Sequence, residues 1–141
     1  MDKKEFNIQN LLDNHEKFKL KWLQDLTIED LFEWVKLKED MVTRLTEMSS
    51  YYMETKLELD KKKWEKMIFL KWELDENGKK RYTDTTAQAI INDEFYQDDI
   101  NQLTLKASID LLKGKVQNII EYVNLVKYYM KLDDDYMQNM K

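Results

Sequence analysis

Eight apolar residues near the C-terminus alternate spacings of four and three without interruption, and this pattern constrains the fold more than any other feature. They are Leu105, Ile109, Leu112, Val116, Ile119, Val123, Val126 and Met130. Such alternation is the heptad repeat of a coiled-coil helix. A second apolar row flanks it and widens the apolar face: Leu111, Tyr122, Leu125 and Tyr129. We therefore predict a long helix covered on two sides, with the eight residues (the heptad seam) as a contact between copies of the chain.

The composition favours the same fold class. The 141 residues include no proline and only two glycines, and 36% of them are charged, which suits long helices and leaves few residues for tight turns. We expect one mainly all-α domain over residues 1–141, with long coiled-coil-like helices packed antiparallel. There is no cysteine, so neither a disulfide nor a thiolate metal site is available. The absence of a long apolar run or an apolar leader favours a cytoplasmic protein without membrane contact.

Two more helices precede this one. Apolar residues at three- and four-residue spacing predict an N-terminal helix that ends by residue 26. In the sequence TIED, Thr27 and Asp30 have the spacing of a capping box, so a second helix should begin there. Apolar residues at a seven-residue beat carry it through residues 27–74, with Lys38 and Thr55 as exceptions. Leu57, Trp64 and Met67 continue on a shifted stripe, which indicates a change of packing partner.

The segment of residues 67–84 allows two interpretations. MIFLKWEL is rich in β-branched and aromatic residues, and Asn77–Gly78 is a common hairpin turn, so we prefer a short β-hairpin. The alternative is a helix that ends at a glycine cap. Residues 75–84 would be a basic turn, and Thr83 or Asp84 would cap a short helix that leads to the long one within residues 85–130. Residues 131–141 would form an acidic tail.

The sequence offers little for catalysis. His15 is the one histidine, it lies on the apolar stripe of the first helix, and nothing pairs it with a nucleophile, so we interpret it as a partly buried structural residue. Glu73, Asp75, Asn77, Gly78 and Asp84 fall in an EF-hand-like frame, but the neighbouring Lys79–Arg81 run would repel a dication. We predict no enzyme, no metal and no cofactor.

The charge is unevenly distributed. The chain carries a formal charge of −5, yet residues 61–81 hold eight basic and four acidic side chains, interleaved with aromatic rings. Cations that follow phosphates and rings that stack on bases are typical of a single-strand nucleic-acid site. The predicted contacts are Lys61, Lys62, Lys63, Lys66, Lys71, Trp72, Lys79, Lys80, Arg81 and Tyr82. In the alternative, Trp64 and Phe69 belong to the core and the lysines only solvate a helix.

Three stretches resemble the UvsY family, the recombination mediators of T-even phages and their relatives: KKKWEKMIFLKWEL, RYTDTTAQAIINDEFY and LTLKASIDLLKGKVQNIIEYVNLVK. The resemblance covers roughly residues 20–130 and lies in the order of the elements. It implies a phage protein that forms a ring-like homo-oligomer, binds single-stranded DNA and a recombinase, and helps the recombinase to displace single-strand-binding protein. The function we expect is a non-enzymatic oligomeric adaptor for DNA recombination.

Two other classes of function fit the same features. A small acidic phage-type inhibitor could block a nucleic-acid-processing enzyme with its negative surface. A structural coiled-coil assembly factor would need only its oligomeric order. Binding to an oligonucleotide separates the adaptor from both of these.

Overall fold

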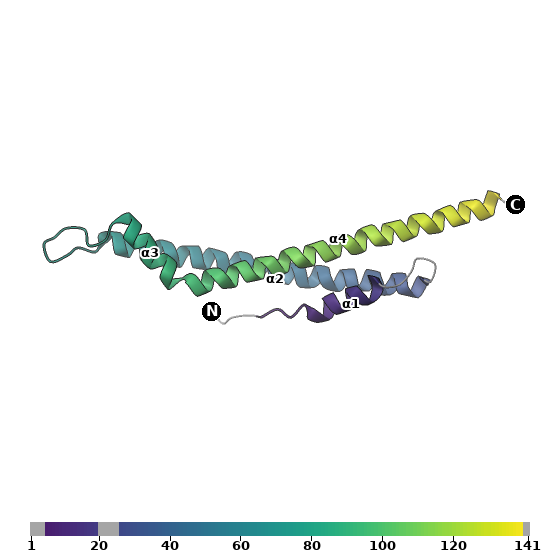
Figure 1. Ribbon diagram of the computed structural model, residues 1–141, viewed down its shortest axis with the longest axis horizontal. Coiled ribbons are helices and arrows are strands. Elements are labelled where there is room, and N and C mark those ends of the chain that lie inside the picture. The colour runs from purple at the N-terminus through teal and green to yellow at the C-terminus, as the bar shows by residue number, and fades with distance from the viewer. Residues whose placement is uncertain (1–4, 20–25, 140–141) are drawn as a thin grey trace. The chain divides into compact units, whose positions relative to one another are not determined.

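The computed structural model describes residues 5–19 and 26–139 and consists of helices (Figure 1). In chain order these are α1 (Gln9–Lys19), α2 (Ile28–Trp72), α3 (Asp84–Glu94) and α4 (Tyr96–Asn139). The prediction of a mainly all-α fold is confirmed. The expected tail from residue 131 is helical as far as Asn139. Residues 20–25, over which the predicted N-terminal helix extends beyond α1, lie outside the described residues.

The chain divides into two compact units, and both long helices contribute residues to each of them. Unit 1 comprises Met1–Met48 and Ile109–Lys141, and unit 2 comprises Ser49–Ser108. Unit 1 therefore holds α1, the first part of α2 and most of α4. Unit 2 holds the end of α2, the loop of residues 73–83, α3 and the start of α4.

The core of unit 1 is formed by the heptad seam of α4 and the inward residues of α2. Ile109, Leu112, Val116, Ile119, Val123 and Val126 are all buried. Trp34, Leu37, Met41 and Met48 of α2 are buried with them. The ring centroids of Trp34 and Tyr122 lie 4.4 Å apart, which joins α2 to α4. The heptad seam thus forms the expected regular helix, but within unit 1 a single chain already buries it.

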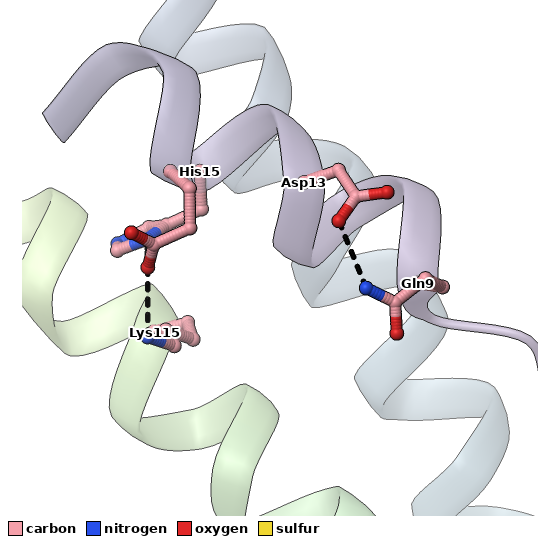
Figure 2. A network of polar contacts seen from close by, with 5 residues as sticks. Gln9, Asp13, His15 and Lys115 are labelled. Carbon is pink, nitrogen blue, oxygen red and sulfur yellow. Dashed lines mark hydrogen bonds and ion pairs between the residues drawn. The ribbon is translucent and has the colours of Figure 1, made fainter. Parts of the chain in front are cut away.

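The first helix is held against this core by polar contacts around one carboxylate. His15 is buried, as expected of a structural histidine, and its Nδ1 lies 3.7 Å from Glu16 Oε1. Lys115 Nζ of α4 lies 3.5 Å from the same carboxylate oxygen, and Figure 2 shows Lys115 reaching toward the helix that carries His15. Gln9 donates a hydrogen bond to Asp13 on the same helix. The pairing of Glu16 with Lys115 therefore joins α1 to α4.

The start of α2 is fixed by the predicted capping box. Thr27 N donates to Asp30 Oδ2 at 2.9 Å, and Asp30 N donates to Thr27 Oγ1 at 3.2 Å. Each side chain thereby satisfies a backbone N–H that the helix leaves without a partner. The sequence TIED therefore sets the start of α2 where the spacing predicted it.

In unit 2 the predicted β-hairpin over residues 67–84 is wrong in its first half, because residues 67–72 are the last turns of α2. The reason is tertiary packing. Leu70 is buried against Ala87 and Ile91 of α3, and Met67 packs against the same cluster, an arrangement that needs the helical spacing. What remains of the hairpin is one antiparallel bridge between Leu74 and Lys80.

The loop between α2 and α3 is closed by Asp75 and Gly78. Asp75 Oδ1 accepts hydrogen bonds from Asn77 N and Lys79 N, both at 2.9 Å, so this carboxylate is used within the turn. Gly78 has a φ of 76°, in the left-handed region that favours glycine. Of the two predicted caps, Thr83 is the one that starts α3, since its Oγ1 accepts a hydrogen bond from Thr86 N at 3.1 Å.

Two contacts join α2 to α4 within unit 2 and show that the helices run antiparallel there. Thr55 bonds to Gln102, and Lys63, later in α2, pairs with Asp99, earlier in α4. Thr55 is one of the two residues that break the apolar beat of α2. The break is explained by this polar contact, because Thr55 Oγ1 meets an amide instead of an apolar side chain.

Candidate nucleic-acid interface

All ten residues predicted to contact nucleic acid lie in unit 2, at the end of α2 and in the loop that follows it. Those on α2 are Lys61, Lys62, Lys63, Lys66, Lys71 and Trp72, and those in the loop are Lys79, Lys80, Arg81 and Tyr82. The ten residues therefore stay within one part of the fold, but those on α2 point to several sides of the helix. Which side each occupies decides what it can contact.

Five of the eight cations are engaged with carboxylates. Lys62 pairs with Glu58, Lys63 with Asp99, Lys66 with Glu94, Lys71 with Asp84, and Arg81 with Glu73. The nitrogen–oxygen distances for Lys66 and Lys71 are 3.4 and 3.9 Å. Glu94 and Asp99 belong to the acidic stretch NDEFYQDD, so this stretch neutralises part of the basic segment within the chain.

Lys63 and Lys66 differ from the other paired cations because they are only half-exposed. Lys63 reaches Asp99 at the start of α4, and Lys66 reaches Glu94 at the end of α3. Lys66 Nζ also lies 5.6 Å from the ring centroid of Phe69. These two lysines thus connect the helices of unit 2, which leaves them less available to phosphates than the sequence pattern suggests.

Lys61, Lys79 and Lys80 are exposed, and none of them forms an ion pair within 4 Å with a carboxylate whose side chain the structure describes. Lys61 lies on α2, whereas Lys79 and Lys80 lie beyond the turn at Gly78. Their ammonium groups face solvent, so these three lysines are the cations of the segment that an anion can contact most readily.

The aromatic rings of the segment divide into exposed and packed ones. Trp72, Trp64 and Phe69 are 80%, 66% and 62% exposed, so the alternative that places Trp64 and Phe69 in the core is wrong. Tyr82 is half-buried and packs against the cluster of Leu70, Ala87 and Ile91. The exposed rings of Trp64, Phe69 and Trp72 are therefore able to stack on a base, while Tyr82 stabilises the docking of α3.

The two exposed tryptophans share one side of α2. Trp64, Ile68 and Trp72 follow at intervals of four residues, and Lys61 precedes Trp64 by three, so these four residues lie on one face, here called the outer face. Leu59 and Leu70, which are buried, lie on the opposite side of the same helix. Helix α2 therefore has two apolar sides in unit 2, and only one of them is covered by the described residues.

Sequence reasoning missed part of the outer face. Met53 and Leu57 extend it toward the N-terminus of α2 at the same four-residue spacing, and both are exposed. The shifted stripe of Leu57 and Trp64 is the sequence pattern that marks this face. From the sequence alone, such a stripe fits a surface packed against a second partner and an exposed surface equally well. Met67, assigned to that stripe, packs against α3 instead.

Comparisons with known proteins add no family to this picture. No protein-family model, curated protein or solved structure matches the chain. Across residues 5–19 and 26–139, the structure contains no helix long and apolar enough to cross a bilayer. Within the same ranges no three His, Asp or Glu side chains are grouped so that they could hold a metal ion.

Proposed function

We propose that the chain is a non-enzymatic adaptor that binds single-stranded DNA through the outer face of α2 and the loop after it. The observation that carries this proposal is the exposure of Trp64 and Trp72 on a segment that also carries exposed cations with no carboxylate partner among the described side chains. Rings and cations in this combination stack on bases and follow phosphates without reading a sequence.

The spacing of the two tryptophans suits a strand laid along the helix. Eight residues separate Trp64 from Trp72, which at about 1.5 Å per residue corresponds to about 12 Å along the axis of α2. Stacked bases lie about 3.4 Å apart, so the rings would engage bases that are separated in the strand. Ile68 lies between them and would contact one of the intervening bases.

Two of the paired cations can add to the interface. Lys62 and Lys71 are exposed, and their partners Glu58 and Asp84 lie at 3.5 and 3.9 Å. Ion pairs on the surface contribute only about 0–1 kcal/mol each, so a phosphate with its full charge competes well for these lysines. Lys63 and Lys66 would stay with their carboxylates on α4 and α3.

We include self-association and a protein partner in the proposal. Three unpaired cations per chain give weak binding, and several copies acting together would raise the affinity through multivalency. Since the heptad seam is buried in unit 1, copies would meet through other apolar residues, such as the exposed Leu111 and Tyr129 of the second row on α4. The resemblance to the UvsY family supports a recombinase as the partner and a phage-infected cytoplasm as the location.

The experiment is a titration of a fluorescently labelled oligothymidine followed by anisotropy at several salt concentrations. We expect binding at low salt, with an affinity that falls steeply as salt rises. Lys79→Ala with Lys80→Ala should make the negative slope of log K against log salt shallower by about 1.4, because each neutralised phosphate of a single strand contributes about 0.7 to its magnitude. The matched control is Lys106→Ala with Lys113→Ala, two exposed lysines of α4. An absence of binding at low salt contradicts the proposal.

Light scattering with and without the oligonucleotide tests the assembly part separately. A monomer that binds DNA would leave the interface intact and remove self-association from the proposal. An oligomer that does not bind DNA would remove the interface.

A further inference from the structure

Unit 1 contains a cavity of about 440 Å³ between α1, α2 and α4. Its apolar walls are formed by Trp34 and Leu37 of α2 and by Ile119, Tyr122 and Leu125 of α4, and His15 of α1 closes one side. Trp34, Leu37 and Ile119 are buried and form its inner part, whereas Leu125 is 50% exposed and lies where the cavity meets solvent. The cavity is in the range of about 300–1,000 Å³ typical of small-molecule sites.

The aromatic walls favour a flat guest. Trp34 and Tyr122 both line the cavity, and their rings pack against each other, tilted by 44° with centroids 4.4 Å apart. A planar aromatic molecule packs against such walls through offset or edge-to-face contacts, worth about 0.5–1.5 kcal/mol beyond its buried area.

The polar groups of the cavity favour a positive charge on that guest. Asn118 and Glu121 complete the lining, both from α4 and both exposed. Glu121 accepts a hydrogen bond from Gln117 Nε2 at 3.1 Å, and this neutral donor leaves the negative charge of the carboxylate in place. Along α4 the nearest cations, Lys115 and Lys127, are each six residues away from Glu121, and Lys115 is engaged with Glu16. A carboxylate beside aromatic faces attracts an ammonium group and repels an anion.

We propose that this cavity binds a small planar aromatic amine, with its ring against Trp34 and Tyr122 and its ammonium group at Glu121. The site lies in unit 1, whereas the residues proposed to bind DNA belong to unit 2, and it does not depend on that function. The alternative occupant of the cavity is an apolar side chain of a partner protein, which would make no ion pair with the Glu121 carboxylate.

The experiment compares two probes with the same ring and opposite charge, tryptamine and indole-3-propionate, by calorimetry and ligand-observed NMR on the full chain. We expect tryptamine to bind at least about fivefold more tightly. Leu125→Trp should fill the entrance and abolish binding, while Leu103→Trp, an equally bulky change at an exposed position of α4 in unit 2, should leave it unchanged. Trp64→Ala with Trp72→Ala should also leave it unchanged, which separates the cavity from the outer face.

Glu121→Gln provides a second variant, at an exposed position of α4. It should bring the two probes to similar affinities, and Asp110→Asn, elsewhere on α4, should not. Failure of tryptamine to bind at millimolar concentration overturns the proposal. Equal binding of both probes, unaffected by Glu121→Gln, overturns the assignment to an amine. Binding that survives Leu125→Trp overturns the cavity as its place.

Discussion

Gln102 of α4 donates a hydrogen bond from Nε2 to Thr55 Oγ1 of α2, joining residues 47 positions apart in the chain. Thr55 Oγ1 in turn donates to the carbonyl oxygen of Tyr51 at 2.8 Å, so it is satisfied on α2 even without the amide. Gln102 is less well satisfied, because its Oε1 is buried and makes no hydrogen bond among the described residues. The two ends of this contact are therefore unequal.

This inequality predicts opposite results for two substitutions. Thr55→Val leaves a partly buried amide without its acceptor and should lower the free energy of unfolding by about 1–3 kcal/mol. Gln102→Leu removes the unsatisfied oxygen together with the donor and should be nearly neutral or stabilising. Urea denaturation followed by circular dichroism measures both. The control is Thr46→Val, because Thr46 Oγ1 also donates to a carbonyl of α2 but is exposed. Equal decreases in the free energy of unfolding for Thr55→Val and Thr46→Val would contradict a stabilising role for the hydrogen bond from Gln102 to Thr55.

The two apolar sides of α2 predict different costs for the same substitution. Leu70 is 4% exposed in the cluster with α3, and Leu57 is 68% exposed on the other side of the helix. Leu70→Ala should lower the free energy of unfolding by about 2–5 kcal/mol, as buried leucines do. Leu57→Ala should change it by less than about 0.5 kcal/mol. Chemical denaturation of the two variants checks this, and a large decrease for Leu57→Ala would show that the outer face is covered.

Thr83 caps α3, so this exposed residue should contribute to the stability of the helix. Thr83→Ala removes the acceptor for Thr86 N and should cost about 0.5–2 kcal/mol, whereas Thr83→Ser should restore most of it. Thr85→Ala, two residues on within α3, is the matched control. Amide hydrogen exchange of α3 measures the effect locally. Equal exchange in both alanine variants would contradict the cap.

Substituting alanine for each of the two glycines should change the free energy of unfolding in opposite directions. A Cβ at Gly78 or Gly114 would meet no atom within 4 Å in the described structure, so backbone conformation alone decides. Gly78→Ala forces a φ of 76° on an alanine and should lower the free energy of unfolding by about 1–2 kcal/mol. Gly114→Ala lies inside α4 and should raise it by about 1 kcal/mol. Thermal denaturation of both variants provides the test, and changes of the same sign in the two would contradict it.

The elements that local patterns define could be predicted from the sequence. The capping box of Thr27 and Asp30 starts α2 because both partners lie within one turn. The alternation from Ile109 to Val126 marks buried positions because a helix repeats its faces at that spacing. Both signals depend on neighbours in the chain and need no knowledge of the fold.

What the sequence could not show depends on contacts between distant residues. The residues from Met67 to Trp72 have strand-like composition, yet they continue α2, and the helical spacing brings Leu70 against Ile91 of α3. The basic segment and the acidic stretch were both visible, but the pairing of Lys63 with Asp99 required α2 and α4 to lie antiparallel. The same folding separated Tyr82, which packs inward, from Trp72, which does not.

The central claim is that Trp64 and Trp72 on the outer face of α2 stack on the bases of a single strand, and one measurement tests it most directly. It is the dissociation constant of a labelled oligothymidine for Trp64→Ala with Trp72→Ala, compared by anisotropy with Tyr128→Ala, an exposed aromatic residue of α4 in unit 1. At about 1–3 kcal/mol per stacked base, each ring removed should weaken binding by at least about fivefold, and Tyr128→Ala should match the unmodified chain. Unchanged affinity in the double variant would contradict the claim.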